Sequence, residues 1–150
     1  MEVKDILQTY RLKKGLTQEQ LAQKVFVTRQ AVSRWENGET SPNHETLKAL
    51  SKLYDVSINT LLGSPRKLVC QCCGMPLEDD YISKETDGTF NEEYCKWCYS
   101  EGKFIYTSID ELIDFLMEHS PNSQGTKEEN RRLYENGLRK LNHWRDDTKK

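Results

Sequence analysis

Paired cysteines are the residues of this 150-residue chain whose types and spacing could do chemistry. Cys70 and Cys73 are spaced CxxC in the run CQCCGM, and Cys95 and Cys98 repeat that spacing in YCKWCY. The separation of the two pairs, residues 74–94, is close to the range usual for zinc sites. The first and fourth residues of each tight turn point to a shared metal ion, so four thiolates can close a tetrahedron around it. We therefore expect one Zn²⁺ per chain.

The expected compartment favours metal binding over disulfide formation. Charges recur every few residues in the amino-terminal MEVKDILQTYRLKK, so this stretch lacks the apolar segment of a secretory signal. No apolar run approaches the roughly 18 residues that span a bilayer. The expected location is a reducing cytoplasm, where paired cysteines more often bind metal or do redox chemistry. A disulfide and four free thiols remain the alternatives.

Cys72 is the fifth cysteine and is left without a role by this pairing. Adjacent residues of one turn do not readily reach the same ion, so we expect Cys72 to be a small, partly buried residue with no chemistry. The alternative is an oxidation trigger, in which an exposed Cys72 forms a disulfide with a ligand and ejects the metal. The histidines, His44, His119 and His143, lie outside the cysteine spacing and are expected at the surface or at helix ends.

The residues around and between the cysteine pairs predict a zinc ribbon. Gly74 follows the first pair, where a residue without Cβ lets backbone amides turn toward the sulfurs, and Gly102 lies shortly after the second. Asp87-Gly88 is a hairpin signal between the short apolar stretches Tyr81-Ile82 and Thr89-Phe90. The order is therefore knuckle, hairpin, knuckle.

Short, densely punctuated helical patterns fill the chain up to Gly63. Thr17 and Gln20 form a capping box, and Thr28 begins a helix that Asn37-Gly38 ends. The first expected helix ends at Gly15, the second runs from Thr17 to about Phe26, and the third runs from Thr28 to Asn37. The fourth follows Pro42-Asn43, and the fifth runs from Ser57 to Leu62. Such a set predicts a compact all-α domain.

The segment TQEQLAQKVFVTRQAVSRWENGETSP resembles the phage-repressor-like helix-turn-helix family, also called the xenobiotic-response-element family, over residues 3–62. The resemblance implies that the second helix lies across the phosphate backbone and the third enters the major groove. It implies that four residues face the bases: Arg29, Gln30, Ser33 and Arg34. Gln18 and Asn37 are expected to contact phosphates, and Thr28, at the start of the third helix, belongs to the same DNA-binding site. It also implies an internal salt bridge between Arg11 and Glu36.

Side-chain chemistry supports the same interface independently. Arg29, Gln30 and Arg34 carry several donors, while Val32 and Trp35 fall on the opposite face of the expected helix. Arginine matches the two acceptors of guanine, and glutamine matches the acceptor and donor of adenine. The alternative is that these polar residues form the solvated side of a small bundle.

The second half of the chain has its own resemblance. CQCCGMPL and DGTFNEEYCKWCYSEGKF resemble a zinc-ribbon domain attached to bacterial regulators, over about residues 68–146, although Cys72 stands where a polar residue is commoner. SIDELIDFLMEH predicts a helix capped by Ser108-x-x-Glu111. A final helical pattern carries Tyr134, Leu138, Leu141 and Trp144, and we expect Asn136-Gly137 to split it. These helices should pack on the ribbon; a self-association surface is the alternative.

Charge and punctuation predict two domains. Residues up to Gly63 carry nine Lys and Arg against seven Asp and Glu, whereas the remainder carries thirteen against seventeen. The amino-terminal part thus tolerates a polyanion better. The expected fold class is mainly α with a small β part: a helix-turn-helix domain over 1–63, a linker over 64–67, and a zinc ribbon with packed carboxy-terminal helices over 68–150.

The expected function is a sequence-specific, DNA-binding transcriptional regulator, with repression by promoter occupancy as the simplest mechanism. A single helix-turn-helix makes a small interface, so we expect a homodimer on an inverted-repeat operator in double-stranded DNA. One alternative is a metal- or redox-responsive regulator, and another is an antitoxin-like or adaptor module whose ribbon binds a protein. We do not expect an enzyme, because a four-cysteine site leaves zinc no open position. No membrane contact is expected.

Overall fold

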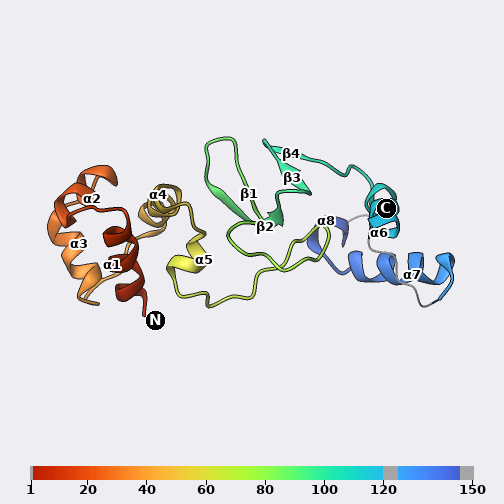
Figure 1. Ribbon diagram of the computed structural model, residues 1–150, viewed down its shortest axis with the longest axis horizontal. Coiled ribbons are helices and arrows are strands. Elements are labelled where there is room, and N and C mark those ends of the chain that lie inside the picture. Colours follow the sequence, from red (N-terminus) through yellow and green to blue (C-terminus); the bar gives the residue numbers. More distant parts are fainter. Residues whose placement is uncertain (1, 120–124, 146–150) are drawn as a thin grey trace. The chain divides into compact units, whose positions relative to one another are not determined.

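The computed structural model describes residues 2–119 and 125–145, which form two compact units. The first contains residues up to Lys67 together with Asp87–Phe90, and the second contains Leu68–Thr86 together with the chain from Asn91 onward. Helices dominate both units, with short antiparallel strands in the second (Figure 1). This confirms the expected fold class, whereas the exact domain boundaries at 63 and 67 remain a prediction. No helix within the described residues is long and apolar enough to cross a membrane.

The first unit is a bundle of short helices around one apolar core. The helices are α1 (Val3–Lys13), α2 (Gln18–Lys24), α3 (Arg29–Glu36), α4 (His44–Tyr54) and α5 (Ile58–Leu61). Val32, Leu50 and Leu61 are completely buried at the centre of that core. Each helix is too short to be stable alone, so the shared core is what holds α3 in place.

Side-chain caps set the start of these helices where the sequence predicts them. Thr17 and Gln20 complete the capping box of α2, and the Thr28 hydroxyl accepts a hydrogen bond from the Ala31 backbone N–H. Asn43 and Ser57 cap α4 and α5 in the same way. One boundary differs: α2 ends at Lys24 rather than near Phe26, because Phe26 adopts a left-handed backbone with φ of 60°.

Two small antiparallel sheets follow in the chain and lie in the second unit, except for residues Asp87–Phe90, which are grouped with the first. Strand β1 (Ile82–Lys84) pairs with β2 (Phe90–Cys95), and β3 (Tyr99–Ser100) pairs with β4 (Lys103–Phe104). The expected hairpin at Asp87-Gly88 therefore forms between β1 and β2. Gly102 has a φ of +78° in the tight turn between β3 and β4, where Ser100 and Lys103 are paired.

Three helices complete the second unit: α6 (Ile109–His119), α7 (Lys127–Leu138) and α8 (Asn142–Arg145). Leu112, Ile113 and Trp144 are almost fully buried, so the packing of these helices into a core is confirmed. The expected cap of α6 forms only in part. The Ser108 hydroxyl accepts from the Glu111 backbone N–H, but the Glu111 carboxylate accepts from the Thr107 backbone and hydroxyl instead of completing the box.

The expected split of the final helical segment into two pieces is confirmed, but the break comes after Leu138 rather than at Asn136-Gly137. Helix α7 continues through Gly137 to Leu138, and the chain turns only at residues 139–141. A glycine inside a helix costs only about 1 kcal/mol. That cost is offset by a capping box between Thr126 and Glu129 and by burial of Leu138.

Candidate functional site

Helix α3 presents a polar face on the first unit. Its apolar side is fixed in the core by Val32 and Trp35, and its amino end is capped by Thr28. The opposite side faces an open hollow of about 280 Å³. Five of the seven residues expected to contact DNA line this hollow together with Glu39: Arg29, Gln30, Ser33, Arg34 and Asn37. The structure thus gathers these side chains on one accessible face, while Thr28 and Gln18 lie outside the hollow's lining.

A buried ion pair lies beneath this face. The Arg11 guanidinium donates from Nε to Glu36 Oε1 at 2.6 Å, and its other arm donates to the Leu16 carbonyl. The two side chains are only 9% and 5% exposed. The expected internal salt bridge is therefore confirmed. Its burial shows that Arg11 is committed to the fold and is not available to a ligand.

Gln18 is drawn into the same network. Its side-chain amide donates to Glu36 Oε2 at 2.5 Å. Glu36 therefore links the start of α2 to α1 and α3, which fixes the angle between the two helices of the motif. The expected contact of Gln18 with a phosphate stays a prediction. Because one hydrogen of the Gln18 side-chain amide is donated to Glu36, the side chain has its second amide hydrogen left for a phosphate.

Phe26 is a feature that the sequence did not single out. It lies between α2 and α3, its side chain is 93% exposed, and its backbone is left-handed. A left-handed backbone is unfavourable for a residue with a Cβ atom. The recognition-helix candidate α3 is thus preceded by a strained turn that carries a large exposed aromatic ring.

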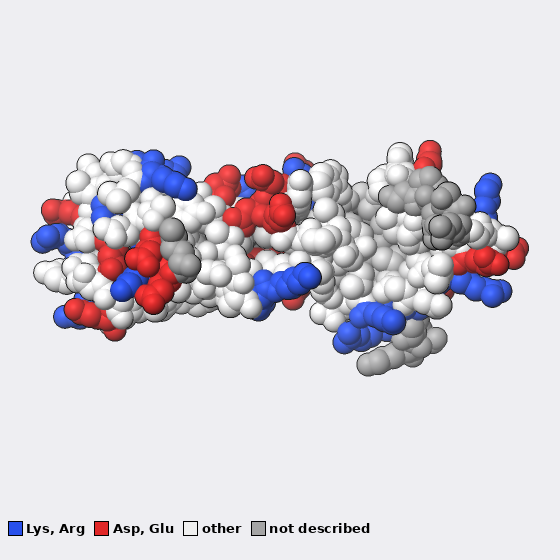
Figure 2. Space-filling view, turned by 60° about the horizontal axis from the view of Figure 1, so that its bottom comes forward, with Lys and Arg blue, Asp and Glu red and all other residues white. Residues whose placement is uncertain are grey.

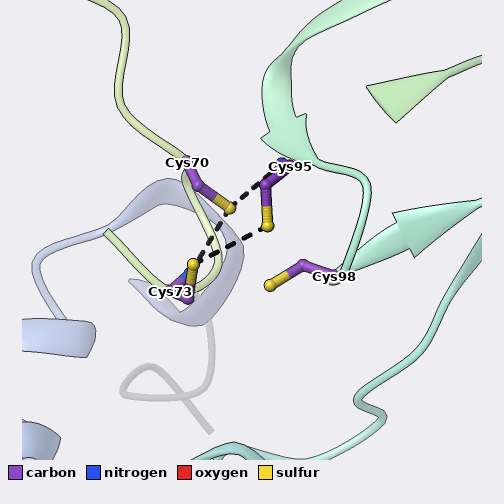
Figure 3. A group of neighbouring side chains, drawn as sticks. All are labelled: Cys70, Cys73, Cys95 and Cys98. Carbon is purple, nitrogen blue, oxygen red and sulfur yellow. Dashed lines mark hydrogen bonds between the residues drawn. The ribbon is translucent and has the colours of Figure 1, made fainter. Parts of the chain in front are cut away.

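Four cysteine sulfurs converge in the second unit. The Sγ atoms of Cys70, Cys73, Cys95 and Cys98 all lie within 4.8 Å of one another, and their side chains point toward a common centre (Figure 3). Cys73 Sγ and Cys95 Sγ are 3.8 Å apart. A zinc ion bound to sulfur at about 2.3 Å requires tetrahedral edges of about 3.8 Å, so the donor set fits zinc.

Backbone amides support the sulfur of Cys70. The N–H groups of Cys72, Cys73 and Cys95 donate to Cys70 Sγ at 3.4, 3.5 and 3.3 Å. The left-handed Gly74, with φ of +81°, closes this turn by donating its own N–H to the Cys70 carbonyl. The Cys73 side chain, followed by those of Cys95 and Cys98, lowers the pKa of Cys70 far below that of an ordinary thiol. The same contacts among the sulfurs raise the pKa of Cys73 and Cys98, so the four groups titrate together and thiolate is favoured at Cys70.

Cys72 is completely buried and is not one of the four clustered cysteines, although its side chain contacts that of Cys98. The Trp144 indole N–H donates to its backbone carbonyl at 2.7 Å. The neighbouring Gln71 also holds α8, because its carbonyl oxygen accepts from the His143 backbone N–H and its side-chain oxygen accepts from that of Asn142. The oxidation-trigger alternative required an exposed Cys72, and the structure does not provide one. The two residues between the ligands instead anchor the last helix.

The histidines behave differently from one another. His44 begins α4 and His119 ends α6, as expected for helix-end residues. His143 is half-buried in an aromatic cluster, with ring centroids 4.3 Å from Phe104 and Trp144 and 5.8 Å from Tyr94. His143 also lies at a helix end, in the single turn of α8, but its aromatic surroundings were not predicted. Only the ribbon's tertiary packing brings these rings together.

Comparison with known families places this geometry in context. Residues 69–145, slightly more than half of the chain, match the family described as "Putative zinc ribbon domain". The chain belongs to the zinc ribbon family. This zinc ribbon protein also matches the family described as "Helix-turn-helix" over residues 7–61, which contain α2 and α3. Both resemblances inferred from the sequence are thereby confirmed.

The chain is similar to named helix-turn-helix regulators over part of its length. The HTH-type transcriptional activator BcrR of Enterococcus faecalis is 50% identical over 62 residues, which are 41% of this chain and 30% of that protein. The chain thus matches less than a third of BcrR's length. The HTH-type transcriptional regulator ImmR of Bacillus subtilis is 29% identical over 71% of this chain and 92% of its own.

Among solved structures, the P22 c2 repressor in complex with a synthetic operator is 36% identical to this zinc ribbon protein. The likeness covers 43% of this chain and 97% of that one, with a TM-score of 0.41.

Proposed function

We propose that this zinc ribbon protein is a sequence-specific, DNA-binding transcriptional regulator that reads the major groove with α3. The observation that carries the proposal is the gathering of Arg29, Gln30, Ser33, Arg34 and Asn37 around one open hollow. The match to the helix-turn-helix family over residues 7–61 supports it. Cytoplasmic location and the lack of an enzymatic role belong to the same proposal.

Base reading is assigned to the exposed side chains near the amino end of α3. Arg29 and Arg34 would donate two hydrogen bonds each to guanine, and Gln30 would pair with adenine. Asn37 and Gln18, at the end of α3 and the start of α2, would bind phosphates and fix the register of the helix. Thr28 holds the amino end of α3 through its cap and would lie beside the bases in the proposed complex.

Bulk charge contributes little to this recognition. Figure 2 shows Lys and Arg interspersed with Asp and Glu on the visible face of the amino-terminal unit. A mixed surface of this kind provides no broad positive field. The proposed affinity therefore depends on the particular donors of α3 and on phosphate contacts, so it should be specific and still weaken with salt.

The four clustered cysteines are proposed to hold one Zn²⁺ per chain. The donor set fits, because four thiol sulfurs share one centre and backbone amides are directed at Cys70 Sγ. Zinc bound by four thiolates supplies structure rather than chemistry. Residues 71 and 72 then connect the metal turn to α8, which explains how a ribbon with short strands can order the last helix.

The proposed form on DNA is a homodimer on an inverted repeat, because one helix of eight residues reads few base pairs. Repression by promoter occupancy remains the simplest prediction, while the likeness to BcrR, named an activator, supports the opposite sign of regulation. A ribbon that binds another protein remains the alternative role of the second unit.

Variants of α3 test the proposal. After a binding site has been selected, Arg29→Ala and Arg34→Ala should each cost about 1–3 kcal/mol on that site and relax the preference at one base pair. Lys48→Ala on α4 is the matched control, because it removes an exposed cation outside the α3 face. Equal losses for all three variants would assign α3 only a bulk electrostatic role and contradict the proposal.

A further inference from the structure

A second pocket lies in the ribbon unit, away from α3. Its volume is about 380 Å³, and three parts of the chain line it: residues 73–75, residues 97–98 with Tyr106, and Leu112, Phe115 and Leu116 of α6. A pocket of this volume falls within the range of small-molecule sites. It exists only because the zinc turns and α6 are packed together.

The pocket is beside the metal site and is not the metal site itself. Cys73 and Cys98 contribute to its wall, whereas Cys70 and Cys95 do not. Among the four clustered cysteines, Cys73 is the one that is only partly buried. A molecule in the pocket would therefore contact the outer side of two metal-binding residues while the centre of the sulfur cluster stays covered.

The chemistry of the wall defines the ligand. Apart from the zinc-ligand candidates Cys73 and Cys98 and the phenol of Tyr106, no ionisable side chain among the described residues lines the pocket, and Met75, Leu112 and Leu116 supply aliphatic surface. Trp97 and Phe115, which are 48% and 42% exposed, add aromatic surface to the same wall. Such a wall disfavours ions, because burying a charge without a partner is costly.

The Tyr106 hydroxyl is a group in this wall that can both donate and accept a hydrogen bond, whereas the Trp97 indole N–H can only donate. The Tyr106 ring lies 5.8 Å from the ring of Phe115, and within the described part of the chain its hydroxyl makes no hydrogen bond. The pocket thus combines aromatic and aliphatic walls with a few polar groups, the usual composition of a small-molecule site.

We propose that this pocket binds a small, uncharged aromatic molecule, held between Trp97, Phe115 and Leu116 and oriented by a hydrogen bond to Tyr106. This inference is independent of the proposed DNA function. It would give the ribbon unit a ligand of its own next to the metal centre.

The experiment uses 2-naphthol as the probe and the zinc-loaded full chain. Titration calorimetry measures affinity, and amide chemical shifts locate the site. Binding should shift residues 73–75, 97–98 and 112–116 and leave the α3 face unchanged. Naphthalene-2-sulfonate has the same rings and a charge, so it should bind at least about tenfold more weakly. No binding of 2-naphthol up to its solubility, or equal affinity for the sulfonate, would overturn the proposal.

Two variants in α6 and one on α7 sharpen the test. Phe115→Ala removes an exposed wall and should weaken 2-naphthol binding about tenfold, and Leu116→Trp should fill the pocket and abolish binding. Leu133→Ala is the matched control, because Leu133 is 64% exposed on α7 and does not line the pocket. Zinc content reports whether each variant keeps its fold. Unchanged affinity in a folded Phe115→Ala variant would contradict the proposed site.

Discussion

Removing one partner of the buried Arg11–Glu36 pair should destabilise the amino-terminal unit strongly. Arg11→Met keeps the aliphatic stem but leaves the Glu36 carboxylate, only 5% exposed, with the Gln18 amide as its remaining donor in the network described above. Loss of one partner from a buried ion pair costs about 3–5 kcal/mol. A small domain has a total stability near the lower end of about 5–15 kcal/mol, so this variant should be largely unfolded at modest temperature.

The double variant Arg11→Met/Glu36→Leu separates pairing from packing. It removes both charges, so the first unit should recover at least about 2 kcal/mol relative to the sum of the single variants. The assay is urea unfolding followed by the NMR signal of the Trp35 indole, because Trp35 is buried in the first unit and reports it alone. Single-variant costs below about 1 kcal/mol would refute the reasoning, since that is the value of an exposed pair.

Three further predictions follow from the structure. The Phe26→Gly variant should be about 1 kcal/mol more stable than the Phe26→Ala variant. Both variants lose the same exposed ring, but only glycine relieves the strain of the left-handed backbone. Equal thermal midpoints of the two variants would show that no strain is present. Burial raises the pKa of Tyr54 to about 12, and its hydroxyl has no hydrogen-bond partner in the described structure. A pKa raised above that of the unfolded chain means that Tyr54 contributes stability below about pH 10 and that this contribution is lost as the pH rises through about 12. In Tyr54→Phe, the urea midpoint should depend less on pH between about pH 10 and 12, and the stability at pH 7 should be unchanged or about 1 kcal/mol higher. If the variant loses as much stability over that pH range as the wild type, the assignment to Tyr54 is contradicted. The Cys72→Ala variant should retain one zinc per chain and the wild-type resistance to peroxide-induced zinc release. The Cys73→Ala variant should have a lower zinc content, as measured by elemental analysis. Equal zinc loss from both variants would exclude the assigned ligand set.

Local signals in the sequence predict much of the fold because their causes are local. The Thr17 capping box and the Asn43 and Ser57 caps depend on residues within one helical turn, and all of them form. The cysteine spacing works for the same reason, because a tight turn by itself directs its first and fourth residues to one side. The sulfur cluster could therefore be predicted before any tertiary contact was known.

Tertiary packing explains the predictions that failed or could not be made. Gly137 is a helix breaker by local preference, yet the cap at Thr126 and burial of Leu138 override it. The aromatic surroundings of His143 and the pocket beside Cys73 join segments that are distant in the sequence, and no local pattern announces either. The DNA contacts of α3 stay a prediction, because specificity depends on a partner's base edges.

The central claim is that α3 reads a specific DNA sequence, and site selection from random duplex DNA tests it most directly. The zinc-loaded full chain, at one fixed salt concentration, should enrich an inverted repeat whose half-sites lie one helical turn, roughly 34 Å, apart. Arg29→Ala should alter the enriched sequence at the same position in each half-site. Failure to enrich any sequence, with the protein folded and one zinc bound, would contradict the account.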